Sequence, residues 1–274
     1  MTAPRRGNRP QHVLTVVKTE EISPHLVRVT ATGDSLAGFG DPEIEGLPNT
    51  DAYAKLLFAD PALGLEPPYD LAELPPEQRP VTRTYTVRRF DRAARELAID
   101  FVVHGDEGLA GPWAQRAQPG ERLVLMGPGS GYSPDPEASW HLLAGDLSAL
   151  PAISSALEAL PDGARGVALI EVTSPDDAID LIHPDGVEIG WLVNPDTADV
   201  DHLAQAVAAA AWPEDVSAVH VFAHGERESI KAVRKVLREK QIDRSRLSIS
   251  GYWARGRAED AFQAEKRTPI GQID

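Results

Sequence analysis

The chain has 274 residues, of which 42 % are hydrophobic and 25 % charged, and its formal net charge is −15. This composition predicts a globular protein of one large or two smaller domains, and the acidic balance argues against nucleic acid as the main partner. The absence of cysteine excludes disulfides, thiolate zinc sites, cysteine-ligated iron–sulfur clusters and a cysteine nucleophile. No apolar run has the length of a membrane span, and the N-terminus lacks the apolar core of a secretory signal. We therefore expect a cytoplasmic protein without stable membrane association.

The first half of the chain is predicted to be antiparallel β structure, because short runs of β-branched and aromatic residues alternate with turn residues. The predicted strands cover residues 12–18, 26–32, 52–58, 84–90, 96–104 and 122–126. Residues 60–80 contain six prolines, and a loop of that length indicates a lid, a binding loop or a mobile segment. A short helix is expected near Pro112, because proline suits the first helical position.

The second half alternates between strand and helix patterns, which predicts a parallel sheet covered by helices. We expect strands at residues 141–144, 166–172, 187–193, 218–223 and 247–251, and helices at 149–160, 200–211 and 228–240. Glycine, proline and serine cluster at residues 127–137, which sets the predicted domains at 1–135 and 136–274. Sheets of this kind bind ligands beyond the carboxyl ends of their strands.

The string Arg83-Thr84-Tyr85-Thr86 lies at the start of a predicted strand, in a run rich in Thr, Tyr and Val. Side chains alternate along a strand, so Arg83 and Tyr85 share one face about 7 Å apart. A flavin dinucleotide needs such a pair, because arginine binds the pyrophosphate and tyrosine stacks on the isoalloxazine. The same string also suits an ordinary half-buried strand with a solvated arginine, and the neighbouring segments must decide between the two.

Three further segments suit nucleotide binding. Residues 104–114 lead from a strand end through three glycines into a helix start, where backbone N–H groups favour a phosphate. Residues 143–153 form the first strand-to-helix turn of the second half, although no Gly-x-Gly-x-x-Gly is present. Residues 250–260 place two aromatic residues and two arginines after the last strand. Each segment also fits a purely structural role in a turn or in helix packing. The candidates are His104, Gly108, Ala110, Gly111, Trp113 and Ala114 in the first segment, Gly145, Asp146 and Ala149 in the second, and Tyr252, Trp253, Arg255 and Arg257 in the third.

The histidines show no metal-binding spacing, and the chain contains no Gly-x-Ser-x-Gly of a serine hydrolase. We therefore predict neither protein metal ligands nor a protein nucleophile.

Taken in order, these segments resemble the siderophore-interacting protein family, FAD-dependent ferric-siderophore reductases that are related to ferredoxin–NADP reductase. The resemblance runs from about residue 13 to 267. It is carried by the strings SPHLVRVTATG, AYAKLLF, RTYTVR, DFVVHG, GLAGPWA, QPGERL, LLAGDLSALPAI, AHGERESIKAVR and GYWARGRAED. It implies a six-stranded antiparallel FAD-binding barrel followed by a parallel-sheet NAD(P)H-binding domain with a C-terminal helix.

The resemblance also implies roles for single residues. Arg83 would hold the FAD pyrophosphate, Tyr85 would stack on the flavin and Thr86 would lie near its redox edge, although alternation puts Thr86 on the opposite face from Tyr85. The second FAD-binding stretch would run from Asp100 and Val102 through His104 to Ala114, and Arg255 and Arg257 would receive the anionic ferric siderophore. Asn194 stands where many relatives have an arginine that suits the 2′-phosphate of NADPH, which leaves NADPH and NADH both open as donor.

The implied reaction is hydride transfer from NADPH or NADH to FAD, then transfer of single electrons to Fe(III) in the siderophore, with release of ferrous iron. The cofactor carries this chemistry, so no catalytic side chain is predicted. Two alternatives stay open: a flavin-containing protein that binds ferric siderophores without NAD(P)H turnover, and a flavin reductase that serves another acceptor such as a ferredoxin.

Overall fold

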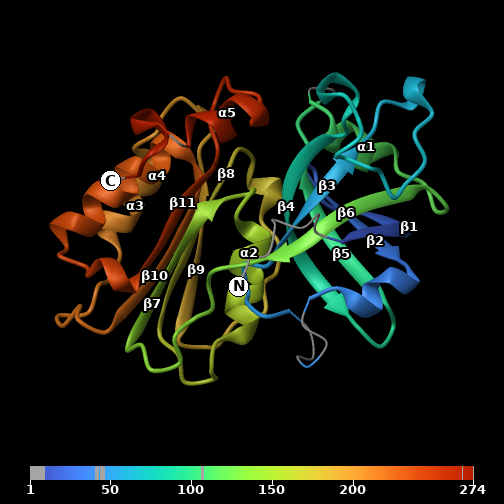
Figure 1. The fold of residues 1–274 in the computed structure, drawn as a ribbon. Coiled ribbons are helices and arrows are strands. Elements are labelled where there is room, and N and C mark those ends of the chain that lie inside the picture. The colour runs from blue at the N-terminus through green and yellow to red at the C-terminus, as the bar shows by residue number, and fades with distance from the viewer. Residues whose placement is uncertain (1–9, 41–42, 44–46, 106–107, 267, 274) are drawn as a thin grey trace, which may run out of the picture.

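The computed structural model describes residues 10–40, 43, 47–105, 108–266 and 268–273. Figure 1 shows two units side by side, a β-barrel built from the first half of the chain and a helix-covered sheet built from the second. This is the fold class that the sequence predicts, so that prediction is confirmed.

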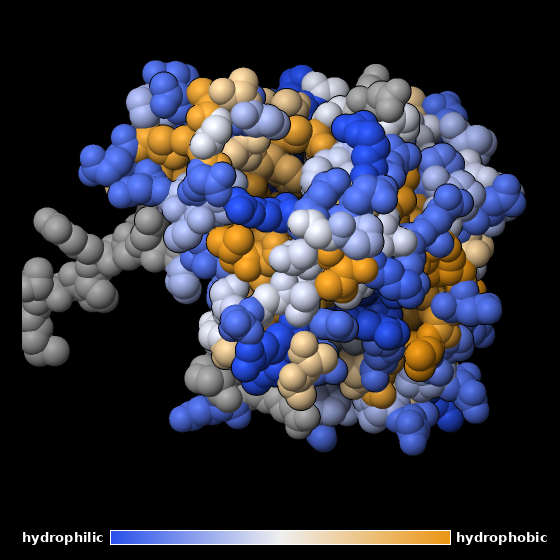
Figure 2. Space-filling view, turned by 90° about the vertical axis from the view of Figure 1, so that its right-hand side faces the viewer, coloured by the Kyte–Doolittle hydropathy of each residue, from blue (hydrophilic) through white to orange (hydrophobic). Residues whose placement is uncertain are grey.

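The barrel closes through six antiparallel strands in the order β1-β2-β5-β4-β3-β6. A short helix, α1, lies between β5 and β6, and the core is apolar, as at Val29, Leu56 and Phe101. On the face seen in Figure 2, apolar patches alternate with polar side chains. The elements are β1 (Gln11–Ser23), β2 (Leu26–Thr32), β3 (Tyr53–Phe58), β4 (Val81–Asp91), β5 (Glu96–Val102), α1 (Ala110–Arg116) and β6 (Arg122–Gly129).

Strand β1 is longer than the apolar pattern predicts, because it continues through the polar residues 18–21 to Ser23. That extension pairs with β2 across a tight turn, from Thr19 opposite Val29 to Ser23 opposite Leu26. This extension is stabilised by backbone hydrogen bonds with β2, so its polar side chains give little indication that it forms a strand.

The loop at residues 60–80 packs against the outside of the barrel. Tyr69 is buried there beside Leu57 and Val124. Gln11 fixes the loop backbone, since its amide accepts from Tyr69 N at 2.8 Å and donates to Tyr69 O at 2.7 Å. The long loop is therefore fastened to the barrel through one side-chain amide and an apolar contact.

The second half forms a five-stranded parallel sheet in the order β11-β10-β7-β8-β9. Helix α2 covers one face, and α3 and α4 cover the other (Figure 1). The elements are β7 (Trp140–Asp146), α2 (Leu150–Ala159), β8 (Gly166–Val172), β9 (Val187–Val193), α3 (His202–Ala209), β10 (Val219–Glu226), α4 (Arg227–Glu239), β11 (Leu247–Trp253) and α5 (Glu259–Glu265).

The connection between β8 and β9 contains only a single 3₁₀ turn, Pro175–Asp177. The barrel supplies apolar side chains to the sheet face on this side, because Leu26, Ile22 and Val102 pack into the cluster that surrounds α2. The barrel thus takes part in the core of the second unit.

Polar contacts also join the two units. Asp177 is fully buried and accepts hydrogen bonds from Ser23 Oγ at 2.9 Å, His25 N at 3.0 Å and His25 Nδ1 at 2.8 Å. Arg88 of β4 forms a two-pronged ion pair with Glu158 of α2. The first set of contacts joins the β1–β2 turn to the β8–β9 connection, and the second joins β4 to α2.

Candidate functional site

The side chains of residues 83–86 in β4 point alternately to the two sides of the strand. Arg83 lies opposite Leu56 and Tyr85 opposite Ala54, and both of these partners belong to the barrel core. The Tyr85 ring packs on Phe101 with a centroid distance of 4.5 Å. The side chains of Thr84 and Thr86 therefore project from the other side of the strand.

Arg83 faces two carboxylates from the start of α5. Its guanidinium lies 3.8 Å from the carboxylate of Glu259 and 3.7 Å from that of Asp260, while Nη1 donates to Thr82 O at 2.9 Å. Both carboxylates are too distant for the 2.7–2.9 Å of a charged hydrogen bond. Glu259 also accepts a hydrogen bond from Thr84 N at 3.1 Å. Burial raises the pKa of Glu259, and the bond from Thr84 and the charge of Arg83 oppose that rise. Anionic oxygens thus already converge on the arginine for which we predict a pyrophosphate.

The segment that leads into α1 reaches the same aromatic cluster from the end of the barrel. The Trp113 ring lies 5.6 Å from Phe101, and Ala110 and Ala114 are buried in the core. Gly111 packs tightly on the backbone, since a Cβ there would lie 3.2 Å from Val102 O. Glycine is therefore favoured at position 111 because a side chain would crowd the backbone of β5.

The two ends of this segment differ from its middle. His104 is exposed at a strand end. Gly108 has φ +84 with open space around an added Cβ, so it is needed for its left-handed backbone. Residues 106–107 lie outside the described residues.

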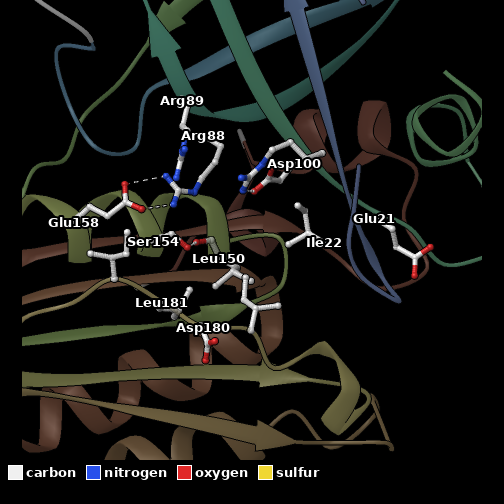
Figure 3. A pocket seen from close by; sticks show the side chains of 13 residues that line it. Glu21, Ile22, Arg88, Arg89, Asp100, Leu150, Ser154, Glu158, Asp180 and Leu181 are labelled. Atoms are coloured by element: carbon white, nitrogen blue, oxygen red, sulfur yellow. Dashed lines mark hydrogen bonds and ion pairs between the residues drawn. The ribbon is translucent and has the colours of Figure 1, made fainter. Parts of the chain in front are cut away.

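Asp100 and Val102 point away from that cluster. Asp100 accepts two hydrogen bonds from the Arg28 guanidinium, at 2.6 and 2.8 Å. It lines a cavity of about 300 Å³ between the barrel, α2 and the β8–β9 connection, where Figure 3 shows Arg88 turned toward Glu158. Val102 packs in the apolar cluster around α2. The contacts of Asp100 and Val102 are thus with the interface between the two units.

In the sheet, Asp146 ends β7 and organises the carboxyl ends of three strands. Its carboxylate accepts hydrogen bonds from Ser148 N at 2.9 Å, Ser148 Oγ at 2.5 Å, Glu226 N at 2.8 Å and Trp253 Nε1 at 2.8 Å. Burial raises the pKa of Asp146, and these four bonds oppose the rise. A Cβ at the preceding Gly145 would lie only 2.3 Å from His224 O, so β7 and β10 approach too closely for any other residue. Ala149 is fully buried behind this turn.

The end of β11 reaches across to the barrel. The Tyr252 phenol lies near Thr86 of β4, and burial raises its pKa above the ordinary value. Its ring is 4.8 Å from that of His224, and burial lowers the pKa of His224 to about 3. This histidine is therefore neutral near pH 7 and adds no cation to the interface.

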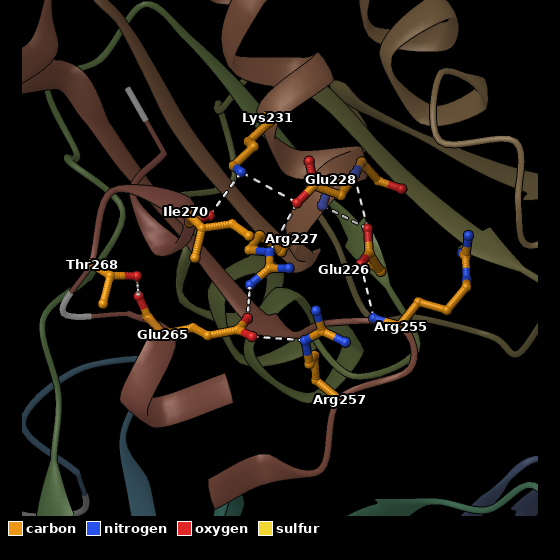
Figure 4. Close-up of polar contacts among 10 residues, drawn as sticks. Glu226, Arg227, Glu228, Lys231, Arg255, Arg257, Glu265, Thr268 and Ile270 are labelled. Atoms are coloured by element: carbon orange, nitrogen blue, oxygen red, sulfur yellow. Dashed lines mark hydrogen bonds and ion pairs between the residues drawn. The ribbon is translucent and has the colours of Figure 1, made fainter. Parts of the chain in front are cut away.

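The two arginines that follow β11 have different surroundings, as Figure 4 shows. Arg257 pairs with Glu265 at 2.7 Å, and Arg227 pairs with the same carboxylate. Arg255 uses its backbone N–H to donate to Glu226 at 3.1 Å. The exposed Arg255 guanidinium forms no hydrogen bond or ion pair with the rest of the described chain. Of the two, Arg255 is the cation that an incoming anion can reach.

The structure thus brings two of the predicted segments together: residues 83–86 of β4 meet residues 252–260 of the second unit where Glu259 lies beside Arg83 and accepts a hydrogen bond from Thr84 N. These contacts were missed by reasoning from the sequence, because the residues lie far apart along the chain. Glu226 was missed as well, although an acid that directly precedes a helical pattern is a recognisable N-cap; it accepts from Glu228 N and Ser229 N.

Among the described residues, none of the helices combines the length and the hydrophobicity that a membrane span requires. The part of the chain that the structure describes also contains no group of three or more His, Cys, Asp or Glu side chains that could hold a metal ion.

Comparison with known proteins extends these observations. A family model described as a siderophore-interacting FAD-binding domain matches residues 15–132, and one described as siderophore-interacting protein matches residues 138–256. The chain is 39 % identical to the ferric vibriobactin reductase ViuB of Vibrio cholerae, covering 95 % of each chain. It is 32 % identical to an NADPH-dependent ferric-chelate reductase of Escherichia coli, covering 88 % of this chain and 91 % of that one.

A solved structure agrees. The siderophore-interacting protein SipS from Aeromonas hydrophila aligns with a TM-score of 0.78 at 32 % identity, over 94 % of this chain and 97 % of that one. The resemblance seen in the sequence is therefore confirmed, and the chain belongs to the siderophore-interacting protein family of FAD-binding oxidoreductases.

Proposed function

We propose that this protein reduces ferric iron held in a siderophore, that electrons pass from NAD(P)H through bound FAD, and that ferrous iron is then released in the cytoplasm. The observation that carries the proposal is the meeting of β4 with the segment that follows β11, where Glu259 lies beside Arg83 and accepts a hydrogen bond from Thr84 N. A flavin on Arg83 and Tyr85 would lie beside the carboxyl ends of the parallel strands, where such sheets bind nucleotides. Two relatives named as reductases of ferric vibriobactin and of ferric chelates support the choice of substrate.

The residues of β4 fit a flavin dinucleotide. Arg83 offers a guanidinium that two carboxylates approach without forming close hydrogen bonds, so a phosphate can replace them. Tyr85 offers an aromatic ring held in place by Phe101. When bound, FAD accepts a hydride and donates single electrons, and the protein binds and orients it. Thr86 is buried on the opposite side of the strand, near Tyr252, so we assign it a role at the interface with the nicotinamide rather than beneath the ring.

Arg255 is the residue that we assign to the anionic ferric siderophore. Its guanidinium is exposed, while its backbone is fixed by Glu226. An exposed cation attracts an anionic chelate and favours its encounter with the protein. Arg257 is less suited, because its guanidinium is already paired with Glu265. Ferrous iron binds hard oxygen chelators more weakly than ferric iron, so reduction is sufficient for release.

The proposal is tested with the purified, FAD-loaded protein under anaerobic conditions. NADH or NADPH should bleach the oxidised flavin spectrum, and a ferric siderophore should restore it while a ferrous-specific chelator reports the released iron. If the flavin stays oxidised with both donors, the protein is not an NAD(P)H-driven reductase. If a generic dye or a ferredoxin reoxidises the flavin and the ferric siderophore does not, the acceptor has been assigned wrongly.

A further inference from the structure

The carboxyl end of β8 carries a carboxylate oxygen that no described group satisfies. Glu171, the penultimate residue of β8, lies between Asp146 of β7 and Leu192 of β9 in the sheet register. Its Oε2 atom is buried and has no hydrogen-bond partner among the residues that the structure describes. Asp146, one strand away, accepts four hydrogen bonds. A buried polar atom without a partner is costly, which points to a missing donor beside Glu171.

In a nucleotide-binding sheet this position is close to the adenosine ribose. The sheet order β9-β8-β7-β10-β11 starts its first strand-to-helix turn after β7, and the dinucleotide crosses the strand ends from there. An acid at the end of the second strand can accept hydrogen bonds from the ribose hydroxyls, whereas a 2′-phosphate needs an arginine instead. The free oxygen of Glu171 suits two neutral hydroxyl donors.

The charges around Glu171 are unsuited to a phosphate. Burial raises the pKa of Glu171; the neighbouring Asn194 and His202 side chains oppose the rise, and the carboxylates of Asp146 and Asp199 add to it. From residue 166 to residue 226 the sequence has twelve Asp and Glu residues and neither Lys nor Arg. This stretch forms β8, β9, α3 and β10, including the strand ends on which the adenosine would rest. A doubly charged 2′-phosphate would meet like charge there.

Asn194 completes the arrangement without adding charge. It follows β9, is buried, and donates from N to Val172 O at 2.8 Å and from Nδ2 to Asp199 O at 3.1 Å. Its backbone N–H thereby ties the ends of β8 and β9 together, and its neutral side-chain amide fastens the loop that follows β9.

We propose that the donor site takes NADH in preference to NADPH, and that Glu171 determines this specificity by accepting hydrogen bonds from the adenosine ribose. The inference rests on the proposed function, because it presupposes a nicotinamide dinucleotide on the sheet. The preference is opposite to the one in the name of the Escherichia coli relative.

Binding of fragments tests the inference without turnover. ADP-ribose and 2′-phospho-ADP-ribose are titrated into the FAD-loaded protein by calorimetry, and ADP-ribose should bind at least about tenfold more tightly, which corresponds to 1.4 kcal/mol. Glu171→Gln keeps the side-chain shape and removes the charge, so it should reduce that ratio about tenfold. Glu188→Gln is the matched control, because Glu188 is an exposed acid at the opposite end of the neighbouring strand β9, and it should leave the ratio unchanged.

The ratio of kcat/KM for NADH and NADPH should follow the binding ratio. Equal binding of both fragments, tighter binding of the phosphorylated one, or an unchanged ratio in Glu171→Gln overturns the inference. If ADP-ribose binds with the expected preference and yet neither dinucleotide reduces the flavin, the inference stands and the proposed reductase function fails.

Discussion

Replacing Glu259 by glutamine should tighten the binding of FAD. Glu259 and the FAD pyrophosphate need the same guanidinium, that of Arg83, so the carboxylate competes with the cofactor. Glutamine has the same length and keeps an oxygen that can accept from Thr84 N, so the change removes the charge and conserves the local geometry.

The magnitude follows from the contacts of Arg83. Asp260 is 3.7 Å away but its side chain is 79 % exposed, so solvent screens it and it contributes little. The Glu259 side chain is only 22 % exposed, which places this pair near the upper end of the range for exposed ion pairs, about 1 kcal/mol. Removing that competition should lower the Kd for FAD about fivefold.

The assay is a titration of flavin-free protein with FAD, followed by the quenching of flavin fluorescence. The gain should shrink as salt is added, because an exposed pair is screened. Glu214→Gln removes the same charge at another exposed position and should leave the affinity unchanged. Unchanged or weaker FAD binding by Glu259→Gln would show that the carboxylate does not compete with the cofactor and would refute the assignment of Arg83 to the pyrophosphate.

Three more predictions follow from the contacts described above. Arg83→Ala should purify with much less FAD than the wild type, measured from the ratio of flavin to protein absorbance, and full occupancy would contradict the assignment. Arg255→Ala should raise the KM for an anionic ferric siderophore several-fold with unchanged flavin content, while Arg257→Ala should have the smaller effect because that arginine is already paired; equal effects would remove Arg255 from the substrate site. Asp177→Ala leaves buried donors of the β1–β2 turn unpaired, which should lower the free energy of unfolding by about 3–5 kcal/mol and the Tm by about 5–9 °C. Thermal unfolding measures this change, and the control Asp176→Ala, at an exposed position, should keep a Tm within about 2 °C of the wild type.

The fold could be predicted because its signals are local. Alternating patterns in the first half and strand–helix alternation in the second each reflect which side of one element is buried. The face shared by Arg83 and Tyr85 likewise follows from the period of a strand alone.

Contacts between distant segments could not be predicted in the same way. The bond from Thr84 to Glu259 joins residues 175 positions apart, and nothing in either local pattern indicates the other. Asp146 is a candidate from the sequence because it ends a strand beside a glycine, but two of its four donors, Glu226 N and Trp253 Nε1, are supplied by other strands that its local pattern does not indicate. The missing hydrogen-bond partner of Glu171 Oε2 could not be predicted either, because it depends on which side chains the adjacent strands place around that atom.

The short connection between β8 and β9 has a consequence for how such chains can be recombined. The barrel supplies Leu26, Ile22 and Val102 to the sheet on the side where this connection provides no helix. Asp177 of the connection accepts a hydrogen bond from Ser23 of the barrel. Expressed alone, the second half would expose apolar surface and a buried acid to water. A chimaera that takes the second half from another reductase therefore also has to take the matching β1–β2 hairpin. The barrel and the sheet are exchanged together more safely than either one alone.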